Sequence, residues 1–438
     1  MTHSNSLPRG GVIPPDSSLI SREAPIANAA VPSVAVIPML QHAGRAAVCV
    51  VKPGDLVREG MLIGRADGAH SANVHSSIPG RVVEVRRLAL QEGISSDAVV
   101  IELGGEFDRS GRPRTLKGWE KLSRIDLLGK IQSAGVVGLG GELVPMHLKL
   151  AVMPGKSASL LVANGIDCEP SLSADYALMR EKPGEIVEAL RICQVLVGAA
   201  RVVLALGEDA EGLVPEFERA LARTGLQCEI ALMPSRYPQG NEQLVVSSLD
   251  GTRLSGPHAG SVVLNVATLF AVYEAVVMDA PLIERVLTVT GAPVAAPRNL
   301  KVRLGTPVRD LFDDCGGLSA RPGKIVVGGP MRGVAIASLD IPVTKGTAGV
   351  TAFAGAEART PKEWPCIHCG VCVEVCPWDL VPTRLHKLIQ QGEIEQAMGE
   401  GLGRCTECGC CAFACPSHIP LVDILRTGKR SRGRTVDG

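Results

Sequence analysis

The sequence predicts a multidomain protein in which β modules flank an α/β core and a small helical domain lies near the C-terminus. Short runs of alternating apolar residues, the pattern of strands, lie on both sides of a stretch where helix-like and strand-like segments alternate. Eight of the fourteen cysteines then fall in two copies of one motif. A chain of 438 residues is long enough for about two to four such domains, each with its own core.

The sequence predicts an extended arm for residues 1–30 and a small all-β module for residues 31–104. The module alternates short apolar runs with Pro-Gly and Asp-Gly turns. The segment 50–55 and the turn at Pro79-Gly80 resemble the barrel-sandwich hybrid of lipoyl and biotinyl carriers. No lysine stands at a hairpin tip, where those carriers attach their prosthetic group, so we expect a structural role for this module.

We expect an α/β core at residues 120–280, because strand-like and helix-like segments alternate there. Strand-like apolar runs lie at 160–165, 201–207 and 228–234. Amphipathic segments with helical period lie at 183–198 and 213–225. This alternation is typical of a sheet that is covered by helices on both faces.

Residues 281–345 return to strand-like runs around one helical segment, and we expect a compact β-grasp module there. Residues 360–425, after a polar linker, hold the cysteine motifs. Residues 426–438 are rich in basic side chains. We expect a solvated, disordered tail, with contact to anionic lipid or to an acidic partner as the alternative.

Each cysteine motif has the spacing C-x2-C-x2-C-x3-C and is followed by proline. This is the ligand spacing of bacterial two-cluster ferredoxins, where the fourth cysteine of each motif binds the cluster of the other motif. We therefore predict two [4Fe–4S] clusters, and we expect Cys410, which lies inside the second motif, to be a non-ligand. The predicted ligands are Cys366, Cys369, Cys372, Cys376, Cys405, Cys408, Cys411 and Cys415.

Composition and charge exclude several other classes of protein. Metal-ligand spacing, rather than a disulfide framework, argues for a reducing compartment. The balance of 45 basic and 45 acidic residues gives no basic face for nucleic acid. The first thirty residues lack the apolar region of a signal peptide, and polar residues interrupt the longest apolar stretch, 261–280. We expect no transmembrane segment in this chain, which would reach a membrane only through partners.

Four polar segments of the predicted core follow strands or begin helices, at 138–145, 164–170, 237–242 and 265–269. Ligands of open α/β sheets gather at such positions, and the three glycines of 138–141 let backbone amides approach a ligand closely. The same segments, in the same order, resemble the flavoprotein subunit of respiratory complex I, which takes hydride from NADH onto FMN. That resemblance implies an FMN pocket lined by Gly138, Gly140, Gly141, Lys149, Asn164, Glu169, Gly240, Asn265 and Thr268. It places Glu242 and Tyr237, as catalytic candidates, near the nicotinamide or the isoalloxazine.

The whole chain resembles the C subunit family of Rnf complexes, membrane-bound ferredoxin:NAD oxidoreductases that pump Na⁺ or H⁺. The matching segments are Gly10-Gly11-Val12-Ile13-Pro14-Pro15, Gln41-His42, Tyr237-Pro238-Gln239-Gly240, Gly328-Gly329-Pro330-Met331 and Cys408-Gly409-Cys410-Cys411-Ala412. The resemblance implies a β-grasp module of the SLBB type and electron passage between NAD(H), FMN and two [4Fe–4S] clusters. It also implies a peripheral position on the cytoplasmic face of the bacterial inner membrane. The implied partners are other Rnf-type membrane and iron–sulfur subunits and, indirectly, ferredoxin.

The chain departs from the family pattern in the glycine-rich loop. Where the family reads Gly-Gly-Ala-Gly-Phe-Pro-Thr-His, this chain reads Gly140-Gly141-Glu142-Leu143-Val144-Pro145-Met146-His147. Ile166 and Asn241 stand where the complex I pattern has acidic residues. These departures motivate one alternative, a non-catalytic subunit that carries clusters beside a degenerate dinucleotide site. A second alternative is a soluble cobalamin reductase of the propanediol-utilisation type, which resembles this chain in its flavoprotein core and paired ferredoxin motifs but is disfavoured by the N-terminal place of the sandwich module.

Overall fold

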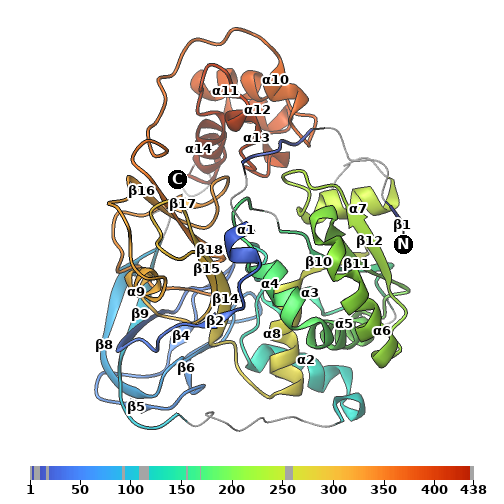
Figure 1. Cartoon of the computed structure of the whole chain (residues 1–438), viewed down its shortest axis with the longest axis vertical. Coiled ribbons are helices and arrows are strands. Elements are labelled where there is room, and N and C mark those ends of the chain that lie inside the picture. Colours follow the sequence, from blue (N-terminus) through green and yellow to red (C-terminus); the bar gives the residue numbers. More distant parts are fainter. Residues whose placement is uncertain are drawn as a thin grey trace.

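The computed structural model describes residues 2–3, 10–15, 19–90, 94–107, 118–153, 156–167, 169–251 and 260–434. Within these ranges the chain forms two β modules, a central α/β core and a helical domain at one end, as Figure 1 shows. The multidomain α/β and β fold expected from the sequence is confirmed. No helix in these ranges is both long and apolar enough to cross a membrane.

Two antiparallel sheets form the first β module and enclose a small apolar core. One sheet has the order β3 (Val34–Pro38), β9 (Ser95–Leu103), β8 (Gly80–Ala89) and β5 (Leu56–Val57). The other consists of β4 (Val48–Cys49), β6 (Leu62–Arg65) and β7 (Val74–His75). Alternate strand residues point to opposite faces, and the inward ones, Ile37, Ile63 and Ile101, are fully buried.

A five-stranded parallel sheet forms the α/β core. Its order is β1 (Thr2–His3), β12 (Glu229–Met233), β11 (Arg201–Gly207), β10 (Leu160–Gly165) and β13 (Ser261–Asn265). The chain continues from β10 to β11 on one side and later returns to place β13 on the other side. Such a reversal opens a crevice at the carboxyl ends of the two diverging strands, where ligands of this fold class bind.

Helices cover both faces of the core sheet, as expected. The helices that share the main apolar cluster with one face are α2 (Arg124–Ser133), α3 (Met146–Lys149), α4 (Ala174–Glu181), α5 (Pro183–Val197), α6 (Val214–Thr224) and α8 (Val266–Val277). The short helices η2 (Trp119–Lys121) and η3 (Glu208–Leu213) join them. The helix α7 (Glu242–Asp250) packs on the opposite face through Val245 and Val246.

The β-grasp module is a six-stranded sheet that extends beyond the expected range 281–345 at both ends. The order is β17 (Val334–Ala335), β16 (Lys324–Val327), β18 (Gly349–Phe353), β14 (Glu284–Thr290), β15 (Arg298–Arg303) and β2 (Ala27–Asn28). The helix α9 (Val308–Asp314) buries Leu311 and Phe312 against this sheet. The boundary expected at residue 345 is therefore too early, because β18 is buried between β16 and β14.

The N-terminal arm is also more than an extended segment. Its residues form the helix α1 (Leu19–Arg22) and strand β2, which pairs with β15, and β1 adds an edge strand to the core sheet. The arm therefore contacts more than one module.

The helical domain consists of α10 (Val371–Glu374), α11 (Pro382–Gln390), α12 (Ile394–Gly399), η4 (Leu402–Arg404), α13 (Cys410–Phe413) and α14 (Leu421–Arg434). The expected disordered tail from residue 426 is wrong for the part that the structure describes, because α14 continues to Arg434. Arg426 and Lys429 both form ion pairs with Glu407, and Leu425 is buried, so this segment is held on the domain. Residues 435–438 lie outside the described ranges.

Candidate cofactor sites

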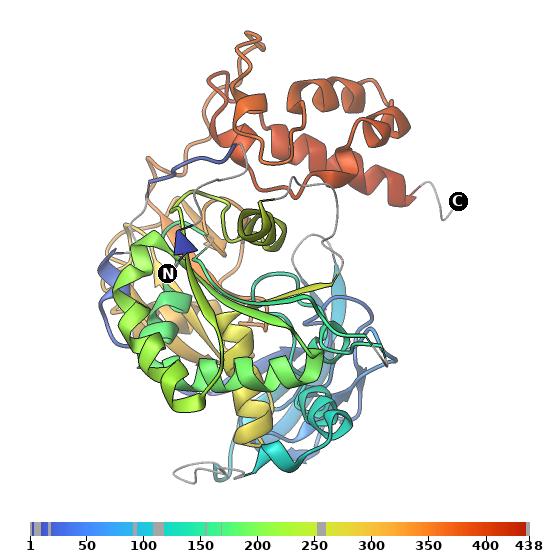
Figure 2. The same ribbon diagram turned by 90° about the vertical axis from the view of Figure 1, so that its right-hand side faces the viewer.

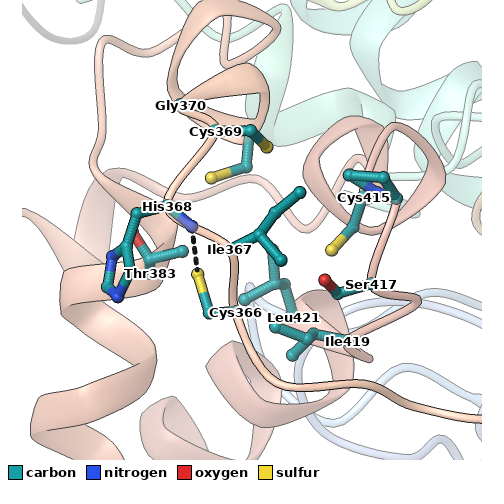
Figure 3. Close-up of a pocket in the computed structure, with 12 residues that line it drawn as sticks. Cys366, Ile367, His368, Cys369, Gly370, Thr383, Cys415, Ser417, Ile419 and Leu421 are labelled. Carbon is teal, nitrogen blue, oxygen red and sulfur yellow. Dashed lines mark hydrogen bonds between the residues drawn. The ribbon is translucent and has the colours of Figure 1, made fainter.

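Two cavities of the helical domain are lined by cysteines of both motifs, four in the first cavity and five in the second. The first contains Cys366, Cys369 and Cys372 of the first motif together with Cys415 of the second (Figure 3). The second contains the predicted ligands Cys405, Cys408 and Cys411 of the second motif, Cys376 of the first, and also Cys410. Each motif therefore supplies three of its predicted ligands to one cavity and its fourth predicted ligand to the other.

The local backbone of the two motifs repeats. Gly370 and Gly409, with φ of 81° and 84°, begin the short helices α10 and α13. Each motif also has a hydrogen bond from the amide two residues after its first cysteine to the sulfur of that cysteine. His368 donates to Cys366 Sγ and Glu407 donates to Cys405 Sγ, both at 3.4 Å. N–H···S bonds of this kind orient the sulfurs and tune the potential of a bound cluster.

The donor sets of both cavities fit iron–sulfur clusters. Among the described residues, no three Cys, His, Asp or Glu side chains lie close enough together to hold a single metal ion. A [4Fe–4S] cube binds one thiolate at each of four separate irons, which suits sulfurs arranged around a cavity. The cavities enclose about 120 Å³ and 20 Å³, so the first is the roomier. Cys369 of the first cavity is exposed to solvent.

Cys410 lines the second cavity beside Cys411, but its side chain also packs against the core. It is fully buried, and its Sγ lies 4.0 Å from the carbonyl oxygen of Tyr237. It belongs to an apolar cluster with Val12 and Tyr237. This placement supports the expectation that Cys410 packs rather than binds iron.

A larger cavity of about 740 Å³ lies at the carboxyl ends of the core strands. Every residue predicted for the flavin and dinucleotide site lines it, although the residues come from four separate segments of sequence. These residues are Gly138, Gly140, Gly141, Lys149, Asn164, Glu169, Tyr237, Gly240, Glu242, Asn265 and Thr268. Thr406 and Cys408 line the same cavity and also the second cysteine cavity, so the two sites share a wall.

The glycine-rich loop closes this cavity on the side of α8. Thr268 Oγ1 accepts a hydrogen bond of 2.8 Å from the amide of Leu139, and a Cβ on Gly140 would lie only 3.0 Å from Asn265. Among the described residues, no backbone carbonyl accepts from the amides of Gly140 or Gly141. Together with the N-terminus of the 12-residue α8, these amides are suited to an anionic group such as phosphate.

In the glycine-rich loop, a position where the family pattern has glycine keeps a left-handed backbone conformation although another residue stands there. Leu143, which stands where the family pattern has glycine, has φ of 55°. A non-glycine residue in this region costs on the order of 1–3 kcal/mol, so surrounding contacts must hold it. The amide of Ala43 donates to the Leu143 carbonyl at 2.9 Å, and the Leu143 side chain packs near Gly346 of the β-grasp module.

Two asparagines that line the cavity form hydrogen bonds with backbone groups around it. Asn164 Nδ2 donates to the carbonyl of Gly240 at 2.8 Å, and its Oδ1 accepts from the amide of Ile166 at 3.2 Å. Asn265 Oδ1 caps α8 by accepting from Ala267 at 2.9 Å, and its Nδ2 donates to Asp175 at 2.5 Å. These residues therefore shape the cavity as well as line it.

Lys149 lies between two carboxylates. Its Nζ is 3.1 Å from Glu142 Oε2 and also donates to Glu242 Oε1. Burial raises the pKa of Glu242 despite the favourable charge of Lys149, and the nearby Glu142 raises it further. Glu142 is thus a partner of Lys149 that the family pattern, with alanine at this position, does not supply.

Glu169 and Tyr237 connect the cavity to its neighbours. Glu169 Oε2 accepts from the amide of Met331 in the β-grasp module at 3.0 Å, whereas its buried Oε1 has no partner among the described residues. Burial raises the pKa of Glu169. The Tyr237 hydroxyl donates to the carbonyl of Cys408 at 2.6 Å, so it points toward the second cysteine motif.

Sequence reasoning missed the part of the wall that the β-grasp module supplies. Gly328, Gly329, Arg332 and Thr347 line the cavity, and so does the buried Arg285. The match at 328–331 was the one sequence signal for this contact, but its packing partner, Glu169, lies about 160 residues earlier in the chain.

The cavity fits a flavin mononucleotide. In the part of the chain that the structure describes, the amides of Gly140 and Gly141 have no backbone acceptor and suit the phosphate, as does the N-terminus of α8. There too the buried Glu169 Oε1 has no partner, and with the polar cavity wall it suits the hydroxyl and N–H groups of the remaining molecule. A fold with this cavity beside two cysteine-lined sites defines a class of protein, the iron–sulfur flavoproteins of electron transfer.

Comparisons with known proteins agree with this class. Residues 131–274 match the Nuo51 FMN-binding domain, and residues 8–106 match the RnfC barrel sandwich hybrid domain. Residues 286–335 match the SLBB domain, and residues 365–419 match the 4Fe-4S dicluster domain. The chain therefore carries FMN-binding and iron–sulfur domains.

Curated relatives cover nearly the whole chain. The C subunit of the proton-translocating ferredoxin:NAD(+) oxidoreductase complex of Clostridium ljungdahlii is 36% identical over 90% of this chain and 86% of its own length. The C subunit of the ion-translocating oxidoreductase complex of Rhodobacter capsulatus is 35% identical over 96% and 82%. The Na(+)-translocating counterpart of Acetobacterium woodii is 34% identical over 87% of both chains. The chain belongs to the RnfC family, the C subunits of Rnf-type ion-translocating oxidoreductase complexes.

A solved structure shows the same fold at lower identity. A chain of an NAD+-reducing [NiFe]-hydrogenase superposes with a TM-score of 0.51 and 19% identity, over 71% of this chain and 61% of its own. At this identity the likeness concerns the fold alone.

Proposed function

We propose that this chain passes electrons between NAD(H) and two [4Fe–4S] clusters by way of FMN. It would do so as a peripheral subunit on the cytoplasmic face of the bacterial inner membrane, where Rnf-type partner subunits translocate Na⁺ or H⁺. One observation carries the proposal: the cavity lined by all predicted flavin positions shares Thr406 and Cys408 with the second cysteine cavity. The predicted flavin cavity and the second cysteine cavity are therefore direct neighbours.

The residues of the cavity have separable roles in this proposal. The amides of Gly140 and Gly141 and the N-terminus of α8 would hold the phosphate, and Asn164 and Asn265 would keep the surrounding loops in place. FMN, when bound, supplies the exchange of a two-electron hydride for single electrons that clusters can carry. The remaining contributions come from side chains of this chain.

Glu242 and Lys149 form the polar end of the cavity. Because burial raises the pKa of Glu242, this carboxyl group can hold a proton above its ordinary pH range and can hydrogen-bond an amide of a nicotinamide. Lys149 balances the charge of Glu242 and Glu142 and keeps both side chains in position.

Tyr237 forms the boundary with the cysteines. Tyr237 is 6% exposed, and in this proposal its ring would limit the entry of water between the cavity and the second motif. Its hydrogen bond to Cys408 fixes the spacing of the two sites. In this arrangement the second cysteine cavity lies next to the flavin, and the first cavity, with the exposed Cys369, lies nearer to external partners.

Reconstitution tests this function directly. The full chain, supplied with iron, sulfide and FMN, is expected to retain flavin and both clusters, and NADH should bleach the flavin and produce the EPR signal of reduced [4Fe–4S] clusters. The Gly141→Asp variant, which places a carboxylate in the loop, should lose flavin and keep its clusters. A chain that carries clusters but binds neither FMN nor NADH would support the cluster-carrying alternative and contradict this proposal.

A further inference from the structure

The N-terminal arm lies between the core and the helical domain. Both ribbon views show the dark-blue segment around residues 10–15 alongside the red C-terminal domain (Figures 1 and 2). Val12 is 8% exposed and packs with Tyr237 and Cys410 in one apolar cluster. This arm carries the paired glycines that the proposed chemistry does not use.

Adjacent residues of the arm bind opposite sides of the junction. The amide of Gly11 donates to the carbonyl of Val375, next to Cys376, at 2.9 Å. Val12 exchanges two backbone hydrogen bonds with Tyr237 of the core, at 2.9 and 3.0 Å. The arm therefore joins the Tyr237 loop, through an isolated β-bridge, to the first cysteine motif.

The junction leaves no room for side chains at the two glycines. Gly10 and Gly11 have φ of 97° and 83°, in the left-handed region that other residues rarely adopt. A Cβ on Gly11 would lie 2.7 Å from the Tyr237 carbonyl oxygen, and a Cβ on Gly10 would lie 2.7 Å from the carbonyl carbon of Cys376. Both contacts are with backbone atoms, so relief of either clash requires a shift of the arm, of the Tyr237 loop or of the helical domain.

Two further contacts meet at the same place. The Tyr237 hydroxyl reaches the Cys408 carbonyl, and a Cβ on Gly409 would lie 3.1 Å from the carbonyl oxygen of Met331. The β-grasp loop, the core and the arm therefore all contact residues that line the second cysteine cavity, close to the wall between this cavity and the larger one.

We propose that the arm at residues 10–12 is a positioning element that sets the distance between the flavin cavity and the second cysteine cavity. The inference rests on the proposed function, because the distance matters only if electrons cross this wall. Electron tunnelling falls steeply with distance, so a small displacement of the helical domain slows transfer although each cofactor site stays intact. The arm thus controls coupling between sites and leaves the composition of each site unchanged.

The test compares Gly11→Ala with Gly54→Ala in the full chain. Gly54 has φ of 96° and no atom within 4 Å of the point where an added Cβ would lie, so its variant shares the backbone strain without the clash. Hydrogen exchange at the amides around Tyr237 and in α10 reports how firmly the helical domain is docked on the core. This readout does not depend on electron transfer or on bound FMN. Stopped-flow absorbance reports flavin reduction by NADH and the later reduction of the clusters.

The expected result is a split between these signals. Gly11→Ala should speed amide exchange at the junction and slow cluster reduction at least tenfold, with flavin reduction, flavin content and iron content unchanged. Gly54→Ala should match the unaltered chain in all of them. Cluster reduction at the normal rate in Gly11→Ala, or unchanged exchange at the junction, would overturn the inference. If the unaltered chain binds no FMN, the proposed function fails, and the exchange measurement alone still decides whether the arm docks the domain.

Discussion

Cys376 and Cys415 each line the cavity of the other motif. Cys376 precedes Pro377 and belongs by sequence to the first motif, yet it lies with Cys405, Cys408 and Cys411. Cys415 lies with Cys366 and its neighbours (Figure 3). The exchange ties the two halves of the domain together, since neither cluster can assemble from one motif alone.

This exchange predicts which variants share a phenotype. Replacing Cys415 by serine should remove the cluster of the first cavity, so its EPR spectrum should equal that of Cys366→Ser and differ from that of Cys405→Ser. Each variant should lose about four irons, because a cube missing one thiolate is labile. A spectrum of Cys415→Ser that equals that of Cys405→Ser would show that each motif binds its own cluster.

The helix caps at the cavity illustrate how elements contribute to the site. Asn265 begins α8 and Asn241 begins α7, and each Oδ1 accepts from the amide two residues later, at 2.9 and 3.0 Å. Loss of an N-cap costs about 0.5–2 kcal/mol. Of the two, Asn265 also bonds the half-buried Asp175 and contacts the glycine-rich loop.

The pair of caps therefore offers a matched comparison. Asn241→Ala should lower the free energy of unfolding by about 1 kcal/mol, and Asn265→Ala by more because it also loses the bond to Asp175, measured by urea denaturation of the flavin-free chain. Asn265→Ala should also weaken FMN binding severalfold in a fluorescence-quenching titration, because the loop over α8 loses its support. Equal FMN affinities in the two variants would count against a role of α8 in holding the flavin.

Local pattern was enough to predict the main elements, and long-range pairing was not. The strands β10, β11 and β12 and the helices α5 and α6 follow from apolar periodicity, and the cysteine spacing predicts both cysteine cavities. Strand β18 was not predicted, because its place at the centre of a sheet depends on partners about 25–60 residues away. The ordering of α14 was not predicted either, because the ion pairs with Glu407 join segments about 20 residues apart.

The same limit applies to the candidate site. Glycine-rich and polar segments at strand ends marked the core side of the cavity, because parallel strands bring such ends together. Arg332 and Thr347 carry no comparable signal, since they reach the cavity only through the docking of the β-grasp module on Glu169.

At the scale of the whole molecule, the modules meet at a fully buried lysine. Lys345 Nζ donates to the carbonyls of Asn73 in the first β module and Gly135 in the core, at 2.8 and 2.7 Å. Its own amide donates to Gln41 Oε1 at 3.1 Å. Burial lowers the pKa of Lys345 to about 7, because a charged ammonium group loses its hydration there. The histidines that face it, His42 and His75, have pKa values lowered to about 4 and 3.

This lysine predicts how stability depends on pH. Between pH 7 and the ordinary lysine value of 10.5, the unfolded chain binds a proton that the folded chain has released. Stability therefore rises with pH across this window, by up to roughly 1.4 kcal/mol per unit, and part of it is lost as the pH falls toward 7. His42 and His75 titrate below the window and do not contribute to this slope.

Comparison with Lys345→Met isolates the contribution of this one residue from the other groups that titrate in the same range. The melting temperatures of the two cofactor-free chains are measured from pH 7 to pH 9.5. As the pH rises, the Tm of the unaltered chain should increase relative to the Tm of Lys345→Met. The control is Lys52→Met, which removes an exposed lysine of the first β module and should follow the unaltered chain in parallel. A constant difference between the unaltered chain and Lys345→Met would mean that Lys345 stays charged in the folded state. In that case the three modules would be joined around a buried ammonium ion, which would need the two carbonyls of Asn73 and Gly135 to replace its hydration.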